Sequence, residues 1–382
     1  MKPLRTYTLL NNLASSLVNP FISFFTASYG ISGVLLAMTT SASIAFPGIV
    51  QFLLTNLWIK AKKSIILGTL TVGILWLTLG LLQIYNSFMV LLYIGVNIAI
   101  GIINFGWLLI LDKISETSRG RILASFNFYS TIGGLIATFI TGFIVKDSLS
   151  LMRYFFITSG IIYIVNSYII SKSDIDVEYP GSKIRLNDEI KKFFIISFLF
   201  TFVWSTAWPL FPLAQVYKFH MNELQIAIID VIGGVSTLSL SHLIGRLVDK
   251  FRTRIMFFGR MALATFPLAY ALSPSVNYIY LAYIISGFTN SASISYTAFI
   301  FDNSTKEEKK SSIALYNLIN GISALTGSSI SSIIFSFISA TVGIVTAINL
   351  MLLSIGILRI ITSFLYLRIK ELHRRDTNLI KS

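Results

Sequence analysis

One carboxylate interrupts a long apolar run of the sequence, where an acidic side chain is costly. Asp230 lies within the run at 222–247, and Gly234, Thr237 and Ser241 continue its face at helical spacing. Inside a membrane-spanning helix such a residue is usually functional. It could take up and release a proton and so couple proton flow to the movement of a solute, or it could hold a cationic solute. It could instead form a structural pair with an Asn, Tyr or Arg side chain.

Amide side chains recur at helical spacing in several other apolar runs, as Asn12 and Asn19 do in the first run. Amides are costly in an apolar environment unless they are paired, so these faces should turn inward. Each amide could instead hydrogen-bond two helices together. Two tryptophans at 204 and 208 could stack on rings or cations. With Asp230, the candidates for lining an internal cavity are Asn12, Asn19, Asn97, Asn104, Asn127, Trp204, Trp208, Asn290, Asn317 and Asn320.

Cationic side chains are expected to stay outside such a cavity. Arg260 lies near enough to the end of its run to extend its guanidinium to water, and Arg359 lies deeper, without an assigned role. A cavity with one carboxylate and no Lys or Arg suits a neutral or cationic organic solute and disfavours a strongly anionic one. His220, His242 and His373 form no metal constellation, and the sequence has no phosphate-binding loop, so neither a metal nor a cofactor is expected.

The elements that must position these residues are long apolar helices. The chain has 382 residues, of which 54% are hydrophobic and 12% charged, whereas a soluble domain carries roughly 25% charged residues. One membrane span needs about 20 apolar residues. Twelve runs satisfy this, near 6–28, 31–57, 64–84, 88–111, 121–145, 150–171, 192–216, 222–247, 253–273, 276–301, 311–338 and 341–368. The sequence therefore predicts an all-α membrane protein with twelve transmembrane helices and no large soluble domain.

The distribution of basic residues predicts the orientation in the bilayer. The formal net charge is +14, and most Lys and Arg residues fall at the two ends of the chain and in alternate segments between runs. Basic residues collect in cytosolic loops of membrane proteins, so this charge does not require a nucleic-acid partner. We expect a multi-pass protein of the cell membrane, monomeric, with both termini in the cytosol. The chain has no cysteine, which excludes disulfides.

The longest polar segment divides the runs into two sets of six. We expect an N-terminal six-helix bundle at 1–171, a cytosolic linker at 172–192 and a C-terminal six-helix bundle at 193–382. The composition of the linker is that of a solvated, flexible tether. A shift of 190 residues brings charged landmarks such as Asp112 and Asp302 into register, and such repeated halves are an organisation found in transporters.

A charged stretch between two runs has a distinctive frame. Residues 245–254, GRLVDKFRTR, have the form G-x-x-x-D-K-x-x-x-R. This frame resembles the loop signature of the major facilitator superfamily, a family of twelve-helix secondary transporters. Arg252 stands where the family has its second glycine, and in the first-half copy at 55–63 Ile59 stands where an Asp is expected. Arg119-Gly120-Arg121 resembles a further family pattern between the fourth and fifth spans.

The resemblance implies two pseudo-symmetric six-helix bundles that move by alternating access around a central cavity, lined by spans one, four, seven and ten. It also implies a cytosolic gate, in which the Asp of the loop pairs with basic residues and faces the start of the fifth helix. The glycine would let one helix approach a neighbour closely. The gate candidates are Gly245, Asp249, Lys250, Arg252, Arg254, Arg119 and Arg121. These charges could instead serve only to orient the chain.

Other functions fit the sequence less well. A multidrug-type exporter is one form of the same assignment. A polytopic membrane enzyme would need clustered carboxylates or histidines at a membrane face, and only Asp112 and Glu116 approach this pattern. A sensor that had lost transport would not need six polar spans. Substrate, direction and coupling ion are left open by the sequence.

Overall fold

The computed structural model describes residues 2–114, 119–146, 148–179, 181, 186–305 and 308–369, with the side chains of 119–129 and of Lys2 outside the description. The described chain is almost entirely helical. Its first part contains α1 (Lys2–Ser16), α2 (Asn19–Ser28), α3 (Gly33–Leu54), β1 (Ile59–Lys60), α4 (Ala61–Leu82), α5 (Ser87–Ile114), α6 (Arg119–Val145), η1 (Leu149–Leu151), α7 (Met152–Ser171) and β2 (Glu178–Tyr179).

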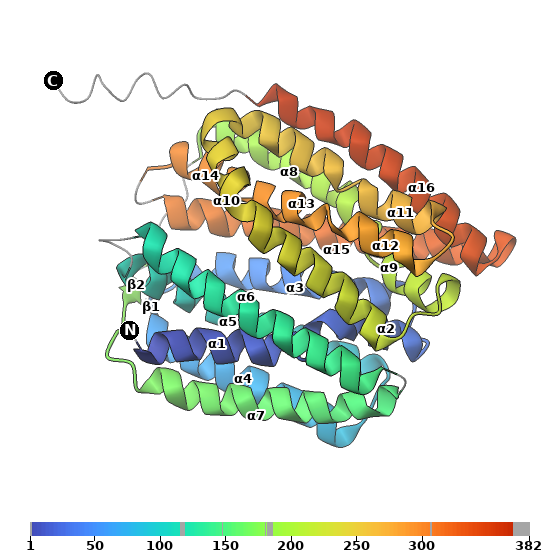
Figure 1. Ribbon diagram of the computed structural model, residues 1–382. Helices are drawn as coiled ribbons and strands as arrows, with labels where there is room; N and C mark the ends of the chain where they lie inside the picture. The colour runs from blue at the N-terminus through green and yellow to red at the C-terminus, as the bar shows by residue number, and fades with distance from the viewer. Residues whose placement is uncertain are drawn as a thin grey trace.

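The elements after residue 186 form the second part of the chain. They are α8 (Asp188–Ser205), α9 (Leu210–Leu213), η2 (Ala214–Lys218), α10 (Glu223–Ala262), α11 (Thr265–Leu272), α12 (Val276–Tyr283), α13 (Ser286–Ala292), α14 (Ile294–Asp302), α15 (Lys309–Val342), α16 (Ile344–Ser363) and η3 (Phe364–Arg368). In Figure 1 the first part occupies the lower region of the molecule and the second part the upper region, with their long helices running in similar directions.

Many of these helices can cross a membrane. Within the described residues, eight stretches are long and apolar enough: Gly33–Leu54, Ala61–Leu82, Ser87–Ile114, Leu149–Ser171, Asp188–Lys218, Glu223–Leu272, Lys309–Val342 and Ile344–Arg368. The prediction of an all-α, multi-pass membrane protein is confirmed. The exact count of twelve spans stays a prediction.

The longest of these stretches is divided at one residue. Glu223–Leu272 contains 50 residues, about 75 Å of helix at ~1.5 Å per residue, more than twice the ~30 Å hydrocarbon core. Phe251 breaks it, with φ −136° and ψ 48° inside α10. The charged stretch at 245–254 is therefore two helix ends that meet at Phe251.

Three further helix breaks lie close to prolines, which cannot donate a backbone hydrogen bond. The first run breaks between α1 and α2, just before Pro20, so Asn12 and Asn19 do not share one uninterrupted helix face. α8 ends before Pro209, and α10 ends before Pro267. These breaks lie in the middle of the runs, where the sequence pattern alone predicts continuous spans.

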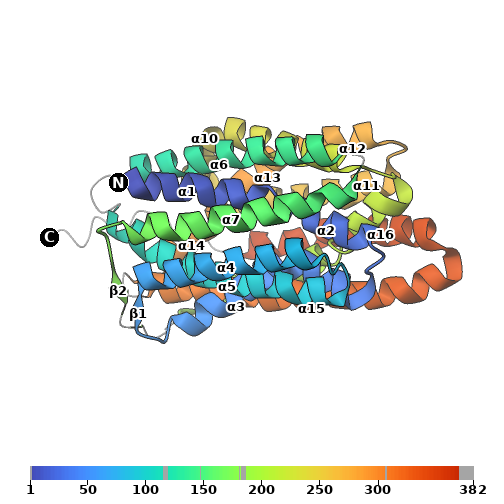
Figure 2. The same ribbon diagram turned by 90° about the horizontal axis from the view of Figure 1, so that it is seen from below.

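The two parts of the chain meet mainly along two helix pairs, α3 with α15 and α6 with α10, and α2 also contacts α9, η2 and α10. Figure 2 shows α3 and α15 side by side. Glycines make the contacts close: a Cβ on Gly48 would lie 2.3 Å from the carbonyl oxygen of Asn317, and one on Gly142 would lie 2.3 Å from the Cβ of Ala227. Small residues let helices approach in this way within a membrane.

The predicted linker contains a short strand, β2. β2 pairs antiparallel with β1, the loop strand between α3 and α4, with Ile59 opposite Tyr179 and Lys60 opposite Glu178. Lys60 forms an ion pair with Glu178 at 3.2 Å. The side chain of Tyr179 is buried, and its ring meets that of Phe105 in α5 edge-on at 5.4 Å.

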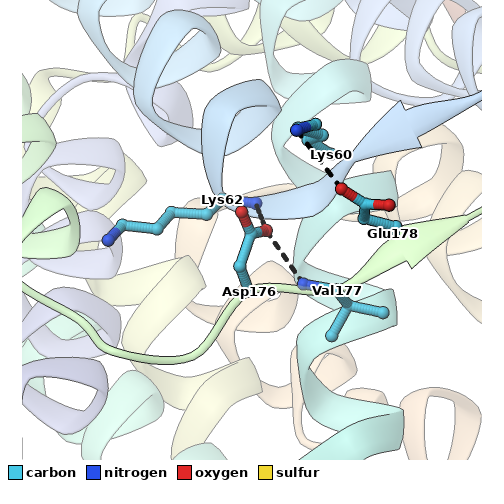
Figure 3. A network of polar contacts seen from close by, with 5 residues as sticks. All are labelled: Lys60, Lys62, Asp176, Val177 and Glu178. Atoms are coloured by element: carbon cyan, nitrogen blue, oxygen red, sulfur yellow. Dashed lines mark hydrogen bonds and ion pairs between the residues drawn. The ribbon is translucent and has the colours of Figure 1, made fainter.

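A carboxylate reinforces this strand pair, as Figure 3 shows. Asp176 Oδ1 accepts hydrogen bonds from the backbone nitrogens of Lys62 at 3.0 Å and Val177 at 2.8 Å. The Lys62 ammonium donates to the carbonyl of Ser173 at 2.5 Å. The expectation of a flexible tether is therefore wrong for residues 173–179. The polar composition of this segment indicates that it is exposed to solvent. It does not reveal that the backbone pairs with a strand more than 100 residues earlier in the chain.

We expect Asp176→Ala to loosen this strand pair while leaving the helices intact. Hydrogen–deuterium exchange of the amides at 59–62 and 176–179 should rise about threefold to tenfold, the equivalent of roughly 0.7–1.4 kcal/mol from the lost hydrogen bonds. Asp174→Ala is the matched control, since Asp174 is exposed two residues earlier. Equal exchange in the two variants would show that Asp176 does not hold the strands together.

Candidate functional site

A cavity of about 560 Å³ lies between the two parts of the chain. This volume falls within the roughly 300–1,000 Å³ of sites for small organic ligands. The first part contributes residues of α2, α3 and α6 to its wall, and the second part contributes residues of α8 to α13 and α16. Its polar lining consists of Ser23, Thr40, Ser43, Trp204, Trp208, Gln215, Asp230, Tyr283, Ser286, Thr289, Asn290 and Arg359.

Asp230 presents its carboxylate to this cavity. α10 begins with a capping box, in which Asn222 Oδ1 accepts from the backbone nitrogen of Gln225 and Gln225 Oε1 accepts from that of Asn222. The helix then carries Asp230 inward, about 10 Å along its axis at ~1.5 Å per residue. Although deep within the protein, its side chain is exposed, because it faces the cavity.

The carboxylate of Asp230 has a shared hydrogen-bond donor. The Thr138 hydroxyl of α6 lies 3.3 Å from Asp230 Oδ2 and 3.2 Å from the carbonyl oxygen of Ser16. One hydroxyl has one proton to donate. Among the described residues Asp230 thus has only a shared donor, and the cavity side of the carboxylate is available to a solute, water or a proton.

Arg359 also belongs to the cavity wall, contrary to the expectation that no Lys or Arg would line it. Its side chain is 0% exposed. One terminal nitrogen donates to the carbonyl of Leu263 at 2.6 Å, and the other donates to the carbonyl of Trp204. Its charge therefore lies behind the lining surface, held by the backbone, and among the described residues it makes no ion pair with Asp230.

The helix breaks supply these two carbonyls. The carbonyl oxygen of Leu263 finds no backbone N–H four residues later, because residue 267 is proline. The amide of Trp208 bonds the carbonyl of Ser205 at 3.0 Å, which leaves the carbonyl of Trp204 free. Carbonyls at helix ends carry partial negative charge and attract cations. The helix breaks before Pro209 and Pro267 thus provide the carbonyls that hold Arg359 behind the cavity wall.

A tyrosine of α12, Tyr283, also lines the cavity. Tyr283 pairs with the hydroxyl of Tyr270, which accepts a hydrogen bond from Gln215 at 2.9 Å. Neither Tyr283 nor Gln215 was singled out from the sequence, because a single Tyr or Gln in an apolar run carries no spacing signal.

Four of the predicted cavity residues line the cavity: Trp204, Trp208, Asp230 and Asn290. The rings of Trp204 and Trp208 are nearly perpendicular, with centroids 4.9 Å apart. Asn290 Nδ2 donates to the hydroxyl of Thr237 at 3.1 Å. The sequence prediction and the geometry coincide on the second part of the chain.

The other predicted amides lie elsewhere. Asn12 and Asn97 donate to backbone carbonyls of their own helices, at 3.0 and 2.8 Å, and Asn19 donates to Ser15 Oγ at 2.6 Å, across the first helix break. Asn104 is exposed outside the cavity lining. The side chain of Asn127 lies outside the described residues.

Two amides join helices, as the alternative interpretation of them allowed. Asn317 donates to Gln51 Oε1 at 2.8 Å, across the α3–α15 contact between the two parts. Asn320 Oδ1 accepts from Thr201 at 2.7 Å, between α15 and α8. Both bonds place polar groups between helices rather than in the cavity.

Arg260 does not extend to water as expected. It is buried, and its guanidinium carbon lies 4.1 Å from the ring centroid of Tyr296 and 4.8 Å from that of Phe200. Trp204 and Tyr366 complete an aromatic cage around it. Aromatic faces stabilise a buried cation, and this alternative to water cannot be seen from sequence position alone.

The proposed gate residues lie at the end of the molecule that carries β1 and β2. Asp249 and Lys250 are exposed there, Arg254 lies over the ring of Phe251 at 5.8 Å, and Arg252 forms an ion pair with Asp302. No described atom lies within 4 Å of where a Cβ of Gly245 would be, so the close approach expected at this glycine is not seen in the described part of the chain.

The side chains of Arg119 and Arg121, the expected partners of Asp249, lie outside the described residues. The same end holds an ion pair that the sequence did not predict. Lys310 Nζ lies 2.9 Å from Asp112 Oδ2 and joins α15 to α5, across the two parts of the chain.

Comparisons with known proteins identify the family. Residues 193–380 match the family model of the Major Facilitator Superfamily. A search of curated protein sequences gave no significant match. Solved structures match over nearly the whole chain: a nucleoside transporter, NupG, at TM-score 0.71 and 14% identity, covers 97% of this chain and 99% of its own.

Other transporters match at similar levels. A D-xylose–proton symporter matches at TM-score 0.67 and 15% identity, over 94% of this chain and 96% of its own. A POT family transporter in complex with 5-aminolevulinic acid matches at TM-score 0.72 and 11% identity, over 96% and 95%. Such different solutes at such low identity mean that the likeness establishes the fold alone. The second half of the chain, residues 193–380, therefore belongs to the Major Facilitator Superfamily, and the whole chain shares its fold with these solved transporters.

Proposed function

We propose that this protein is a secondary active transporter that moves a small neutral or cationic organic solute by alternating access. The observation that carries the proposal is the cavity of about 560 Å³ between the two parts of the chain, with the accessible carboxylate of Asp230 in its wall. The moving units would be two six-helix bundles, residues 1–171 and 193–382, joined by the segment 172–192.

The contacts between the parts support this mechanism. The α3–α15 and α6–α10 pairs flank the cavity and rest on small residues, which lets packed helices tilt against each other. The lining includes Pro20, Trp208 and Leu263, at or beside the helix breaks. Discontinuous helices at a central site are common in transporters, because the freed backbone groups can bind ligands and the breaks can bend.

Proton coupling through Asp230 is part of the proposal. The carboxylate is open to the cavity and shares the hydroxyl of Thr138 with a backbone carbonyl, so its protonation state can follow whichever side the cavity faces. An ionised carboxylate is costly within the bilayer, and a bound proton removes that cost.

The orientation is proposed from charge. The end with β1, β2, Lys310 and Arg252 would face the cytosol, since basic residues collect there. Both termini would then be cytosolic, and the protein would act as a monomer in the cell membrane.

A multidrug-type exporter is the second candidate, and one observation favours it. Besides the two tryptophans, the rings of Phe24, Phe211 and Phe266 line the cavity. Such aromatic surfaces accept apolar compounds of varied shape.

Transport by the purified protein in proteoliposomes tests the proposal. A panel of nucleosides, sugars, peptides and organic amines should include solutes that enter or leave only when protein is present, and faster when a proton gradient is imposed. Protein-free liposomes are the control. Flux that ignores the gradient would remove the coupling role of Asp230, and no flux of any panel member through correctly folded protein would contradict the transporter assignment.

A further inference from the structure

We propose that Tyr270 positions two groups of the cavity wall, Gln215 and Tyr283, so that the protein selects solutes that carry a hydrogen-bond donor. This inference rests on the proposed transport function and narrows its solute class. Tyr270 belongs to α11 and is fully buried behind the described lining. Figure 1 shows α11 beside α9 and α12, at one end of the second part of the chain.

Gln215 presents one end of its amide to the cavity. It lies in η2, a wide π-helical turn in which the backbone nitrogen of Phe219 bonds the carbonyl oxygen of Ala214 at 3.0 Å. Turns of this kind occur often at functional sites. Gln215 Nε2 donates to the hydroxyl oxygen of Tyr270 at 2.9 Å, and among the described residues none donates to Gln215 Oε1. Because the side chain is part of the cavity lining, its amide oxygen is available as an acceptor for a solute.

The hydroxyl of Tyr270 determines which end of the amide faces the cavity. This hydroxyl is also bonded to that of Tyr283. One hydroxyl has one proton to donate. With that proton directed to Tyr283, the oxygen of Tyr270 accepts from Gln215, which fixes Nε2 toward Tyr270 and Oε1 toward the cavity. A Gln amide without such a partner can turn over and present its NH₂ group instead.

Two further kinds of contact hold Tyr270 in place. Lys218 Nζ donates to the carbonyl oxygens of Tyr270 at 2.7 Å and Ala271 at 2.8 Å, so η2 is tied to the end of α11. The ring of Tyr270 packs against Phe211 and Phe219, with centroids 5.0 and 5.8 Å away. Replacement of Tyr270 by Phe would keep these contacts and remove only the hydroxyl.

An acceptor with a fixed orientation discriminates between solutes. When a solute without a donor fills the site, the acceptor loses its hydrogen bonds to water and gains none, so a site built around it rejects that solute. Asp230 adds a second acceptor to the same wall. A solute with N–H or O–H groups satisfies these acceptors, whereas its methylated analogue leaves them unpaired.

Paired solutes in proteoliposomes test this selection. The pairs are uridine and 3-methyluridine, xylose and its fully O-methylated derivative, and benzylamine and benzyltrimethylammonium. For whichever pair the protein moves, the KM of the donor-bearing member should be lower by about threefold to tenfold, as one hydrogen bond implies. Tyr270→Phe should raise that KM to near the value of the methylated member, and leave the KM of the methylated member and the maximal rates unchanged. Gln215→Leu should do the same, and the double variant should change the KM no further, because both substitutions remove one interaction.

Tyr7→Phe is the matched control, since the buried hydroxyl of Tyr7 bonds Thr69 at 3.2 Å outside the cavity lining; it should keep the discrimination of the parent. Thermal unfolding checks that each variant is folded, and Gln215→Leu alone tests the selection if Tyr270→Phe does not fold. Equal KM values within a pair in the parent, discrimination that Tyr270→Phe preserves, or effects that add in the double variant would overturn the inference while the transporter assignment stands. If the folded protein moves no member of any pair, both fail.

Discussion

Replacement of Arg359 by methionine is expected to lower the free energy of unfolding by about 2–6 kcal/mol. Methionine keeps an unbranched, flexible side chain, but two buried carbonyls, those of Leu263 and Trp204, lose their donors. Each unsatisfied buried acceptor costs about 1–3 kcal/mol. The carbonyl of Leu263 cannot turn to its own helix, because Pro267 has no N–H to offer.

Thermal unfolding of the detergent-purified protein, followed by intrinsic fluorescence, measures this effect. Arg153→Met is the matched control, since Arg153 is only partly buried and donates an exposed hydrogen bond to Gln83 Oε1 at 3.2 Å; it should change stability by less than about 0.5 kcal/mol. Arg359→Lys should fall between them, because one ammonium keeps the charge but lacks the planar fork. Equal stability of the two methionine variants would mean that the helix breaks do not depend on Arg359.

Gly48→Ala is expected to separate α3 from α15 and to impair transport. A Cβ there would lie 2.3 Å from the carbonyl oxygen of Asn317 and 2.8 Å from its carbonyl carbon, both backbone atoms. Backbone cannot rotate away as a side chain can, so the helices must part. An overpacked contact of this kind costs about 1–3 kcal/mol, which would shift the protein away from the arrangement that has this contact.

Disulfide formation reports this separation directly, because the natural chain has no cysteine. Cysteines placed at positions 51 and 317, whose side chains now bond at 2.8 Å, should cross-link in the parent and at least about fivefold more slowly with Gly48→Ala, as a cost of 1 kcal/mol implies. Gly95→Ala is the control, since its nearest neighbour is the flexible end of Leu75 at 3.2 Å. Unchanged cross-linking in Gly48→Ala would show that α3 and α15 can accommodate the added methyl group without separating.

Much of the fold could be predicted from the sequence because hydropathy is a local property. Apolar runs identify helices wherever they pack, and a charged frame such as 245–254 identifies the family. Asp230 could be found for the same reason, since a carboxylate in an apolar run is conspicuous. Asn290 and the two tryptophans followed from helical spacing on the same part of the chain.

What could not be predicted depends on contacts between distant segments. The partners of Arg359 are carbonyls freed by helix breaks. Its placement behind the wall therefore depends on how α8, α10 and α16 pack together. Pro209 and Pro267 were available as a signal that α8 and α10 would break, but not which cation would bind the freed carbonyls. The burial of Arg260 depends on aromatic rings from other helices, which its distance from the end of the apolar run does not reveal.

The pairing of β2 with β1 limits the length of free chain between the two parts that we propose to move. With Tyr179 anchored to the first part and Asn187 capping α8 while bonded to the carbonyl of Asn303 at 2.8 Å, only the chain from 179 to 187 can span a widening gap. Eight residues reach at most about 26–29 Å when fully stretched. The two parts can therefore separate at this end of the molecule only up to that distance. A wider separation would require β2 to dissociate from β1.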